Sequence, residues 1–225
     1  MSFRSLGAVV LDEIISAKGK TLVDLPGGLG VFSTLGARIA VSGEGPTKLK
    51  SIGMFVLDGG EFPTSPKLRS TLWDWEISLL FRLVQPRSTT ICEAQTGGSL
   101  GPNLKDRGAG NYGMGFIVIR SVEHGCLVVS ESYPLRWFPQ FHTDKSKLTD
   151  VRGSGSAFLG AFALMLGNGA NPTEAAIMGT VAASFAVEQT GLPYRAGFND
   201  NTRETWNRVE VSARVAEYRA RLGDA

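Results

Sequence analysis

The stretch that decides the fold is residues 150–162, which read DVRGSGSAFLGAF. Two glycines, Gly153 and Gly155, precede an apolar run that continues to a second glycine group at 167–169. This pattern predicts a glycine-rich turn, then a helix, then a glycine stop. Backbone N–H groups at the start of such a helix favour an anion. The residues predicted to bind that anion are Gly153, Ser154, Gly155 and Ser156.

The next segment predicts a second helix with a well-marked start. Asn171 suits an N-cap, Pro172 the first helical position, and Glu174 the third. Small and apolar residues then indicate a buried helix, which we expect to be closed by the glycine and proline at 191–193. Beyond it, residues 202–222 predict a charged amphipathic helix.

The N-terminal part alternates strands with turns. Residues 6–11 (LGAVVL) predict a buried strand whose C-terminal end carries Asp12. Residues 24–38 (DLPGGLGVFSTLGAR) predict a glycine-rich turn that leads into a helix, and residues 51–57 predict a second buried strand.

The middle of the chain predicts a helix over 64–76, one or two strands within 77–93, and two strands at 115–120 and 126–130. Residues 95–113 are glycine-rich and predict a linker or loop. Strands of uniform apolar character, mixed with helices, indicate an α/β sandwich with a mainly parallel sheet. Ligands on such sheets bind at the carboxyl ends of the strands.

Composition excludes several classes of protein. The chain has 225 residues, 43% of them apolar, and a net charge of +2, so disorder is excluded and nothing calls for nucleic acid as a partner. The two cysteines have no metal-ligand or disulfide spacing. The N-terminal apolar run is short and ends in acidic residues, so neither a signal peptide nor a membrane span is expected. We predict one cytoplasmic domain over 1–225.

Residues 24–38 and 150–162, in this order, resemble the two glycine-containing signatures of the PfkB carbohydrate-kinase family. The second block is similar to the family pattern Asp-Thr-x-Gly-Ala-Gly-Asp-x-Phe. Within the family, the chain resembles the fungal Mak32-like subgroup, notably in its ASFAVEQTGLP segment. The resemblance implies a ribokinase-like three-layer α/β sandwich. It also implies that Gly27 and Gly28 close around a substrate, and that the region of Asp12 offers a carboxylate to substrate hydroxyl groups.

The departures from the family pattern bear on function. Where the family has the Asp that acts as base on the sugar hydroxyl, this chain has Ser156, and Val151 replaces the family's Thr. Val122 stands where the family usually has the first glycine of a Gly-x-x-Gly turn. The family's central block is missing, and residues 95–113 bridge that gap. We therefore predict a shortened chain with a degenerate catalytic motif.

Each candidate site residue has a structural alternative. Asp12, Asp150 and His142 are candidate catalytic groups, but the alternatives are a strand-end or turn Asp, a capping Asp and an exposed loop histidine. Ser156 suits a first-turn serine better than a nucleophile. The candidate substrate-binding residues, which otherwise serve as turn or core residues, are Gly27, Gly28, Trp137 and Phe141.

Three hypotheses follow. The first is a repurposed enzyme that cyclises, isomerises or eliminates from a small, rather apolar metabolite without a cofactor. The second is an ATP- and magnesium-dependent sugar kinase in which another carboxylate, such as Asp150, acts as base. The third is a non-catalytic binding protein. A missing central block should also uncover apolar sheet surface, which predicts a homodimer. We favour an enzyme with a small-molecule ligand and no nucleic-acid or membrane partner.

Overall fold

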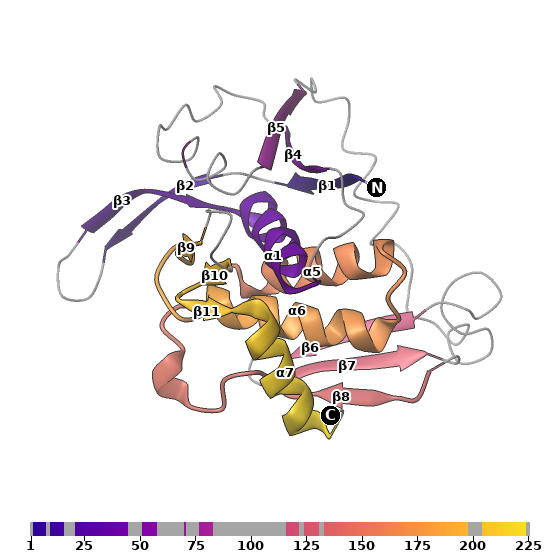
Figure 1. Cartoon of the computed structure of the whole chain (residues 1–225). Helices are drawn as coiled ribbons and strands as arrows, with labels where there is room; N and C mark the ends of the chain where they lie inside the picture. The colour runs from indigo at the N-terminus through magenta and orange to yellow at the C-terminus, as the bar shows by residue number, and fades with distance from the viewer. Residues whose placement is uncertain are drawn as a thin grey trace, which may run out of the picture.

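The computed structural model describes residues 2–7, 10–15, 21–44, 51–57, 70, 77–82, 116–121, 124–130, 133–197 and 204–223. Within these ranges, the element order mixes strands and helices, and small sheets surround helices at the centre of the molecule (Figure 1). Helices and sheets in this order confirm the predicted α/β class. No helix in these ranges is both long enough and apolar enough to cross a membrane.

The N-terminal strands form a parallel sheet and a separate ribbon. In the sheet, β4 (Ser51–Leu57) lies between β1 (Ser2–Gly7) and β5 (Ile77–Arg82), and both pairings are parallel. The ribbon pairs β2 (Val10–Ile15) with β3 (Thr21–Gly27) in antiparallel fashion and extends away from the helices (Figure 1). The single strand predicted over 6–11 is therefore wrong. Its residues are divided between β1 and β2, which belong to different sheets, and Asp12 lies within β2.

Two helices cross with their backbones in contact. Helix α1 (Leu29–Glu44) packs on α5 (Ser154–Gly167), and each begins after a glycine-rich turn, as predicted. A Cβ placed on Gly36 would lie 1.8 Å from the carbonyl oxygen of Ala157, and one on Gly160 would lie 1.8 Å from that of Ser33. A side chain at either glycine would force the helices apart, so the two positions define how closely α1 and α5 approach.

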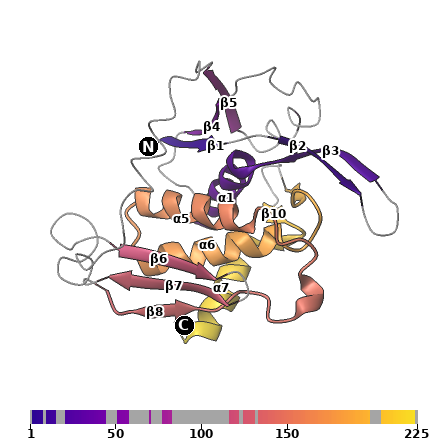
Figure 2. The same cartoon turned by 180° about the vertical axis from the view of Figure 1, so that it is seen from behind.

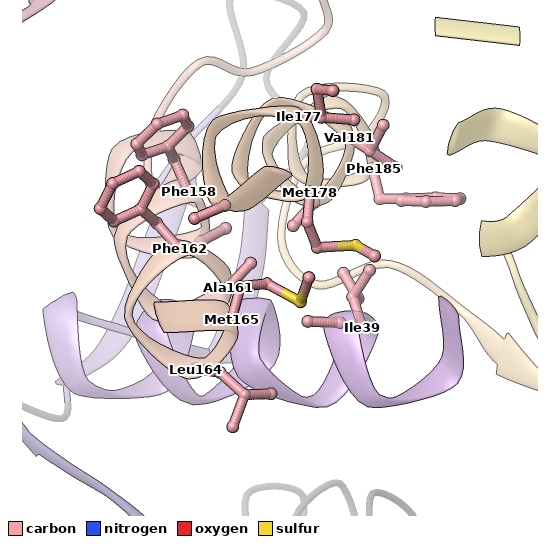
Figure 3. Close-up of a cluster of buried hydrophobic side chains, with 14 of the residues drawn as sticks. Ile39, Phe158, Ala161, Phe162, Leu164, Met165, Ile177, Met178, Val181 and Phe185 are labelled. Carbon is pink, nitrogen blue, oxygen red and sulfur yellow. The ribbon is translucent and has the colours of Figure 1, made fainter. Parts of the chain in front are cut away.

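The third central helix, α6 (Pro172–Ala186), packs against α5 and completes the core. Asn171 caps it by accepting a hydrogen bond from the backbone N–H of Glu174 at 2.9 Å, which confirms the predicted start. Figure 3 shows Met165 of α5, Met178 of α6 and Ile39 of α1 gathered between the helices. The helix ends at Ala186, earlier than the predicted glycine and proline, because residues 187–194 form a loop.

A three-stranded antiparallel sheet packs on the other side of α6. It consists of β6 (Phe116–Ser121), β7 (Gly125–Ser130) and β8 (Arg136–Phe138). Figure 2 shows this sheet on one outer side of the molecule, with α6 and α7 (Val211–Leu222) behind it. The strands predicted at 115–120 and 126–130 are confirmed. No strand was predicted at the position of the short strand β8.

The helix predicted over 202–222 begins later than expected. Its first part forms two short strands, β10 (Thr205–Trp206) and β11 (Val209–Glu210), joined to β9 (Arg195–Ala196). Asn207 and Arg208 between them have positive φ angles, which a helix does not accommodate. The predicted helix over 64–76, apart from Ser70, and the predicted loop over 95–113 lie outside the described residues.

One buried carboxylate joins α1 to the C-terminal strands. Glu204 accepts hydrogen bonds from Arg38 at 2.7 Å and from Arg195 at 2.9 and 3.0 Å. It also accepts from Ser42 and from the indole N–H of Trp206. Burial raises the pKa of Glu204, but the bonds from Arg195 and Ser42 and the charge of Arg38 outweigh burial, so this pKa lies below its usual value.

Replacing Glu204 with Gln removes the negative charge that the two arginines share. We expect the free energy of unfolding at pH 7 to fall by about 3 kcal/mol, the usual cost of breaking a buried ion pair. Because the folded-state pKa is depressed, this stabilisation is present above the unfolded pKa of about 4.3 and is lost as the pH falls through the folded value.

Urea unfolding of wild-type and Glu204→Gln proteins at neutral and acidic pH measures this effect. The matched control is Glu217→Gln, whose side chain is 62% exposed and pairs with Arg221 on the surface of α7. The control should cost less than about 1 kcal/mol. Equal costs for the two variants, or a difference that does not shrink in acid, would contradict the assignment.

Candidate functional site

A cavity of about 580 Å³ lies between β6, β7, the loop after β8, and helices α5 and α6. Four of its lining residues are basic: Arg120, His124, His142 and Lys145. Its apolar lining residues are Phe141, Leu148, Val151, Phe158, Ala183 and Val187. No Asp or Glu occurs among the described residues that line the cavity. This lining favours a small molecule that has an apolar part and a negative charge.

Arg120 brings its charge to the first turn of α5. A Cβ placed on Gly155 would lie 2.4 Å from a terminal nitrogen of Arg120, so a side chain there would displace the guanidinium from this position. The same guanidinium lies 5.0 Å from the ring centre of Phe158. Burial lowers the pKa of Arg120, yet an arginine remains charged at neutral pH. The helix start and Arg120 thus place positive potential at one end of the cavity.

The glycine turn before α5 depends on α1. Gly153 is the N-cap of α5, with φ 76° and ψ −18°, in the left-handed region that favours glycine. A Cβ at this position would lie 2.4 Å from the ring of Phe32, in the first turns of α1. Gly28, directly before α1, also has a positive φ of 92°. The two glycine-rich stretches noted in the sequence are therefore in contact.

Asp150 is bound to its own neighbour. It accepts hydrogen bonds from the backbone N–H of Arg152 at 3.0 Å and from Nε and Nη2 of that side chain at 2.9 and 2.7 Å. These side-chain bonds hold the pKa of Asp150 below its usual value, although partial burial opposes them. The hydrogen bond with Asp150 and the charge of that carboxylate raise the pKa of Arg152. The charge of Asp12, on the β2–β3 ribbon, adds a smaller contribution.

His142 lines the cavity and is largely buried, with a side chain that is 12% exposed. The alternative of an exposed loop histidine is therefore wrong. Its Nε2 lies 3.0 Å from Oε1 of Glu188, in the loop that follows α6. Phe141 beside it is buried, lines the cavity, and has the guanidinium of Arg221 at 4.3 Å from its ring centre.

Trp137 and Cys126 differ in their relation to the cavity: Trp137 lies outside its lining and Cys126 within it. Trp137 is 44% exposed on β8 and lies apart from the cavity lining, on the sheet face opposite to the buried Phe138. Cys126 lines the cavity, but burial raises the pKa of its thiol to about 11, although a hydrogen bond with Thr180 and the charge of Arg120 oppose this rise. The thiol is protonated at neutral pH and is a poor nucleophile.

Of the predicted site residues, His142, Phe141 and Ser154 line the cavity together. Gly153, Gly155 and Ser156 form the turn and first helical turn beside it, and Ser156 occupies the third position of α5. Gly27, Gly28 and Asp12 belong to the ribbon and the start of α1. Sequence reasoning missed Arg120, Lys145 and Glu188, because single charged residues in strands and loops carry no motif.

Several solved kinase structures have a similar arrangement. The nucleoside kinase of Methanocaldococcus jannaschii, described as an archaeal member of the ribokinase family, has a TM-score of 0.59 and 13% identity, covering 96% of this chain and 98% of its own. The ribokinase of Thermotoga maritima has a TM-score of 0.56 and 17% identity at the same coverage.

The fold is ribokinase-like. A third structure, adenosine kinase of Schistosoma mansoni with 2-fluoroadenosine, has a TM-score of 0.58 and 9% identity over 84% of this chain and 96% of its own. These likenesses confirm the predicted ribokinase-like fold class. Identities this low show the fold and leave the activity open.

Two fungal proteins are similar in sequence. An uncharacterised protein of Schizosaccharomyces pombe is 32% identical over 122 residues, covering 48% of this chain and 34% of that protein. Protein MAK32 of Saccharomyces cerevisiae is 31% identical over 111 residues, covering 47% and 30%. The chain thus matches about a third of the length of these relatives. No family model matches the sequence.

The cationic lining leads to a binding prediction. Arg120→Gln should weaken the binding of inorganic pyrophosphate, the probe anion, by about tenfold, because charge-assisted bonds to arginine contribute on the order of 1.5–3 kcal/mol. Isothermal titration calorimetry and the pyrophosphate-induced rise in melting temperature measure the effect.

The matched control is Arg208→Gln, which removes the same charge from an exposed turn outside the cavity lining. It should leave pyrophosphate binding unchanged. Equal weakening in both variants would mean that net charge, rather than this cavity, attracts the anion.

Proposed function

We propose that the chain binds a small molecule with an anionic group and an apolar part, and converts it without transferring a phosphoryl group from ATP. The observation that carries this proposal is the cavity, which has basic and apolar walls and no carboxylate among its described lining residues. The proposed reaction is a cyclisation, isomerisation or elimination that needs no cofactor. Such reactions depend on orientation and on a few charged groups, which a preformed cavity supplies.

The residues around the glycine turn do not favour phosphoryl transfer. Ser156 stands in the first turn of α5, and a serine accepts no proton at neutral pH without a base of its own. The nearby Asp150 is an ionised acceptor already bound by Arg152 through three hydrogen-bonding groups. Loss of a general base typically slows a reaction by about 10²–10⁴-fold.

The described cavity residues also fit magnesium poorly. Mg²⁺ in nucleotide sites is held by one or two carboxylates together with phosphate oxygens. The described lining offers no such carboxylate, and the basic groups that it has repel a cation. ATP-dependent transfer to a sugar is therefore the second candidate, favoured by the ribokinase-like fold, and a purely binding protein is the third.

Phosphoryl transfer is tested directly. We expect no magnesium-dependent transfer from ATP to ribose, fructose or adenosine, followed by ³¹P NMR, and no rise in melting temperature with millimolar MgATP beyond that given by pyrophosphate at equal concentration. Turnover onto any of these acceptors that is abolished by Asp150→Asn would establish the kinase function instead.

We also propose that the outer face of β6, β7 and β8 packs against a second copy of the chain. Cys126, Val128 and Phe138 face the core, so the alternate residues lie on the opposite face. The apolar members of this alternate set are Ile117, Ile119, Leu127, Val129 and Trp137. Ile119 is 53% and Trp137 is 44% exposed.

The chemistry of this outer face supports a second copy as its partner. Ile119, Leu127 and Trp137 form one cross-strand row. Five of the seven alternate residues are apolar, and the other two, Ser121 and Gly125, are uncharged. Leu135, in the turn before β8, extends the apolar surface and is 67% exposed. A neutral face of this kind is self-complementary, as an interface related by two-fold symmetry requires, and two such sheets pack face to face.

Sedimentation equilibrium tests the homodimer. We expect the wild-type protein to dimerise and Ile119→Lys to weaken the dimer by at least about tenfold, because a charge would be buried in an apolar interface. Leu159→Lys is the control, since Leu159 is 60% exposed on α5. A wild-type monomer at every concentration, or equal weakening in both variants, would refute this interface.

A further inference from the structure

Glu188 connects the cavity wall to buried groups behind it. Its Oε1 lies 3.0 Å from Nε2 of His142 and 2.9 Å from a terminal nitrogen of Arg214 on α7. Its Oε2 accepts a hydrogen bond from the side-chain amide of Asn207 at 2.7 Å. The exposed fractions of the His142, Glu188 and Arg214 side chains are 12%, 19% and 6%. The carboxylate is thus held from three directions.

His142 is the member of this cluster that lines the cavity, whereas Glu188 and Arg214 are not among the lining residues. Arg214 already balances the charge of Glu188, and its guanidinium lies 3.7 Å from the ring centre of Phe185. A purely structural ion pair would be complete with these two residues. The imidazole is an additional member, placed between the pair and the cavity.

The contact with Glu188 determines which ring nitrogen carries the hydrogen. Burial raises the pKa of Glu188, but the bonds from His142 and Asn207 and the charge of Arg214 outweigh burial and hold this pKa below its usual value. Glu188 is therefore an ionised carboxylate at neutral pH and only accepts hydrogen bonds. Nε2 of His142 must donate, so in the neutral ring the lone pair is on Nδ1.

Nδ1 has no hydrogen bond to any residue that the structure describes, and the ring edge contacts Phe141 with 5.0 Å between centroids. The charged groups around the ring are Glu188 from the loop after α6, Arg214 from α7, and Asp144 from the ring's own loop. Lys145 lines the same cavity. A carboxylate that fixes one imidazole nitrogen and leaves the other as acceptor is the arrangement of a general base.

We infer that His142 is the proton-transferring residue of this cavity and that Glu188 is its positioning residue. The inference rests on the proposed function. Nδ1 accepts a proton from a carbon acid of the bound anion, the C–H electron pair stays on the ligand as an enolate, and Glu188 stabilises the imidazolium. Arg120 and Lys145 offset the new negative charge. Return of the proton to another atom of the same ligand completes an isomerisation, with nothing else consumed.

The tautomer is measured without a substrate, by long-range ¹H–¹⁵N NMR of protein labelled in its histidine rings. The chain has only two histidines, so the spectrum of His124→Asn assigns both rings. We expect neutral His142 in the Nε2–H form in wild-type protein, in excess over the other tautomer by about tenfold or more. Glu188→Gln should abolish that excess.

The matched control is Glu174→Gln, which makes the same change at a helix start where Glu174 pairs with Arg219. It should leave the His142 tautomer unchanged. An Nδ1–H tautomer in the wild type, or an Nε2–H tautomer that Glu188→Gln does not alter, would overturn the inference.

A second measurement uses the wild-type protein alone, in case Glu188→Gln does not fold. Diethyl pyrocarbonate acylates an imidazole nitrogen only when that nitrogen has a free lone pair and the reagent can reach it. We expect mass spectrometry to find His142 modified despite its burial, and pyrophosphate to slow the modification. An unmodified His142 beside a modified His124 would contradict a role in the cavity. Both readouts are independent of the phosphoryl-transfer assay, so either proposal can fail alone.

Discussion

The close crossing of α1 and α5 is the contact on which the rest of the structure depends. Gly36 and Gly160 let the backbone of each helix lie against carbonyl oxygens of the other, at distances that no side chain would allow. The same approach seats Phe32 on Gly153, which must be glycine for both space and conformation. The crossing therefore determines the space around the turn at the start of α5, and Arg120 of β6 lies beside the same turn.

The charges near this turn support the function proposed for the cavity. Asp150 and Arg152 neutralise each other, so the carboxylate closest to the turn is already occupied. The walls of the cavity then carry basic side chains with small polar and apolar groups. Such a site holds a negative charge and stabilises one that develops during reaction, whereas it gives little help to a magnesium-bound nucleotide. Behind the wall, the pairing of Glu188 with Arg214 allows a buried carboxylate to stay ionised beside an imidazole.

The sequence predicts the elements whose signals are local. The glycine-rich turns, the capped start of α6 and the apolar strands β4, β6 and β7 have such signals, and the structure confirms them. The predictions that the structure contradicts failed for physical reasons. Residues 205–210 have a helical pattern of apolar residues, but pairing with β9 and the positive φ angles at Asn207 and Arg208 override it. The site itself was predicted in part, because His142 and Phe141 were named. Glu188, the partner of His142, was missed, since it is 46 residues further along the chain and only folding brings it to His142.

We propose that the cavity beside the glycine turn holds a small anionic molecule and is not a phosphoryl-transfer site. A crystal structure of the protein with the ligand that it retains through purification, combined with mass spectrometry of that ligand, tests this proposal. We expect an organic anion with its charged group near Arg120 and the first turn of α5, and with its apolar part against Phe141 and Phe158. Electron density for a magnesium-bound nucleoside triphosphate, with its terminal phosphate directed at a sugar, would refute the proposal.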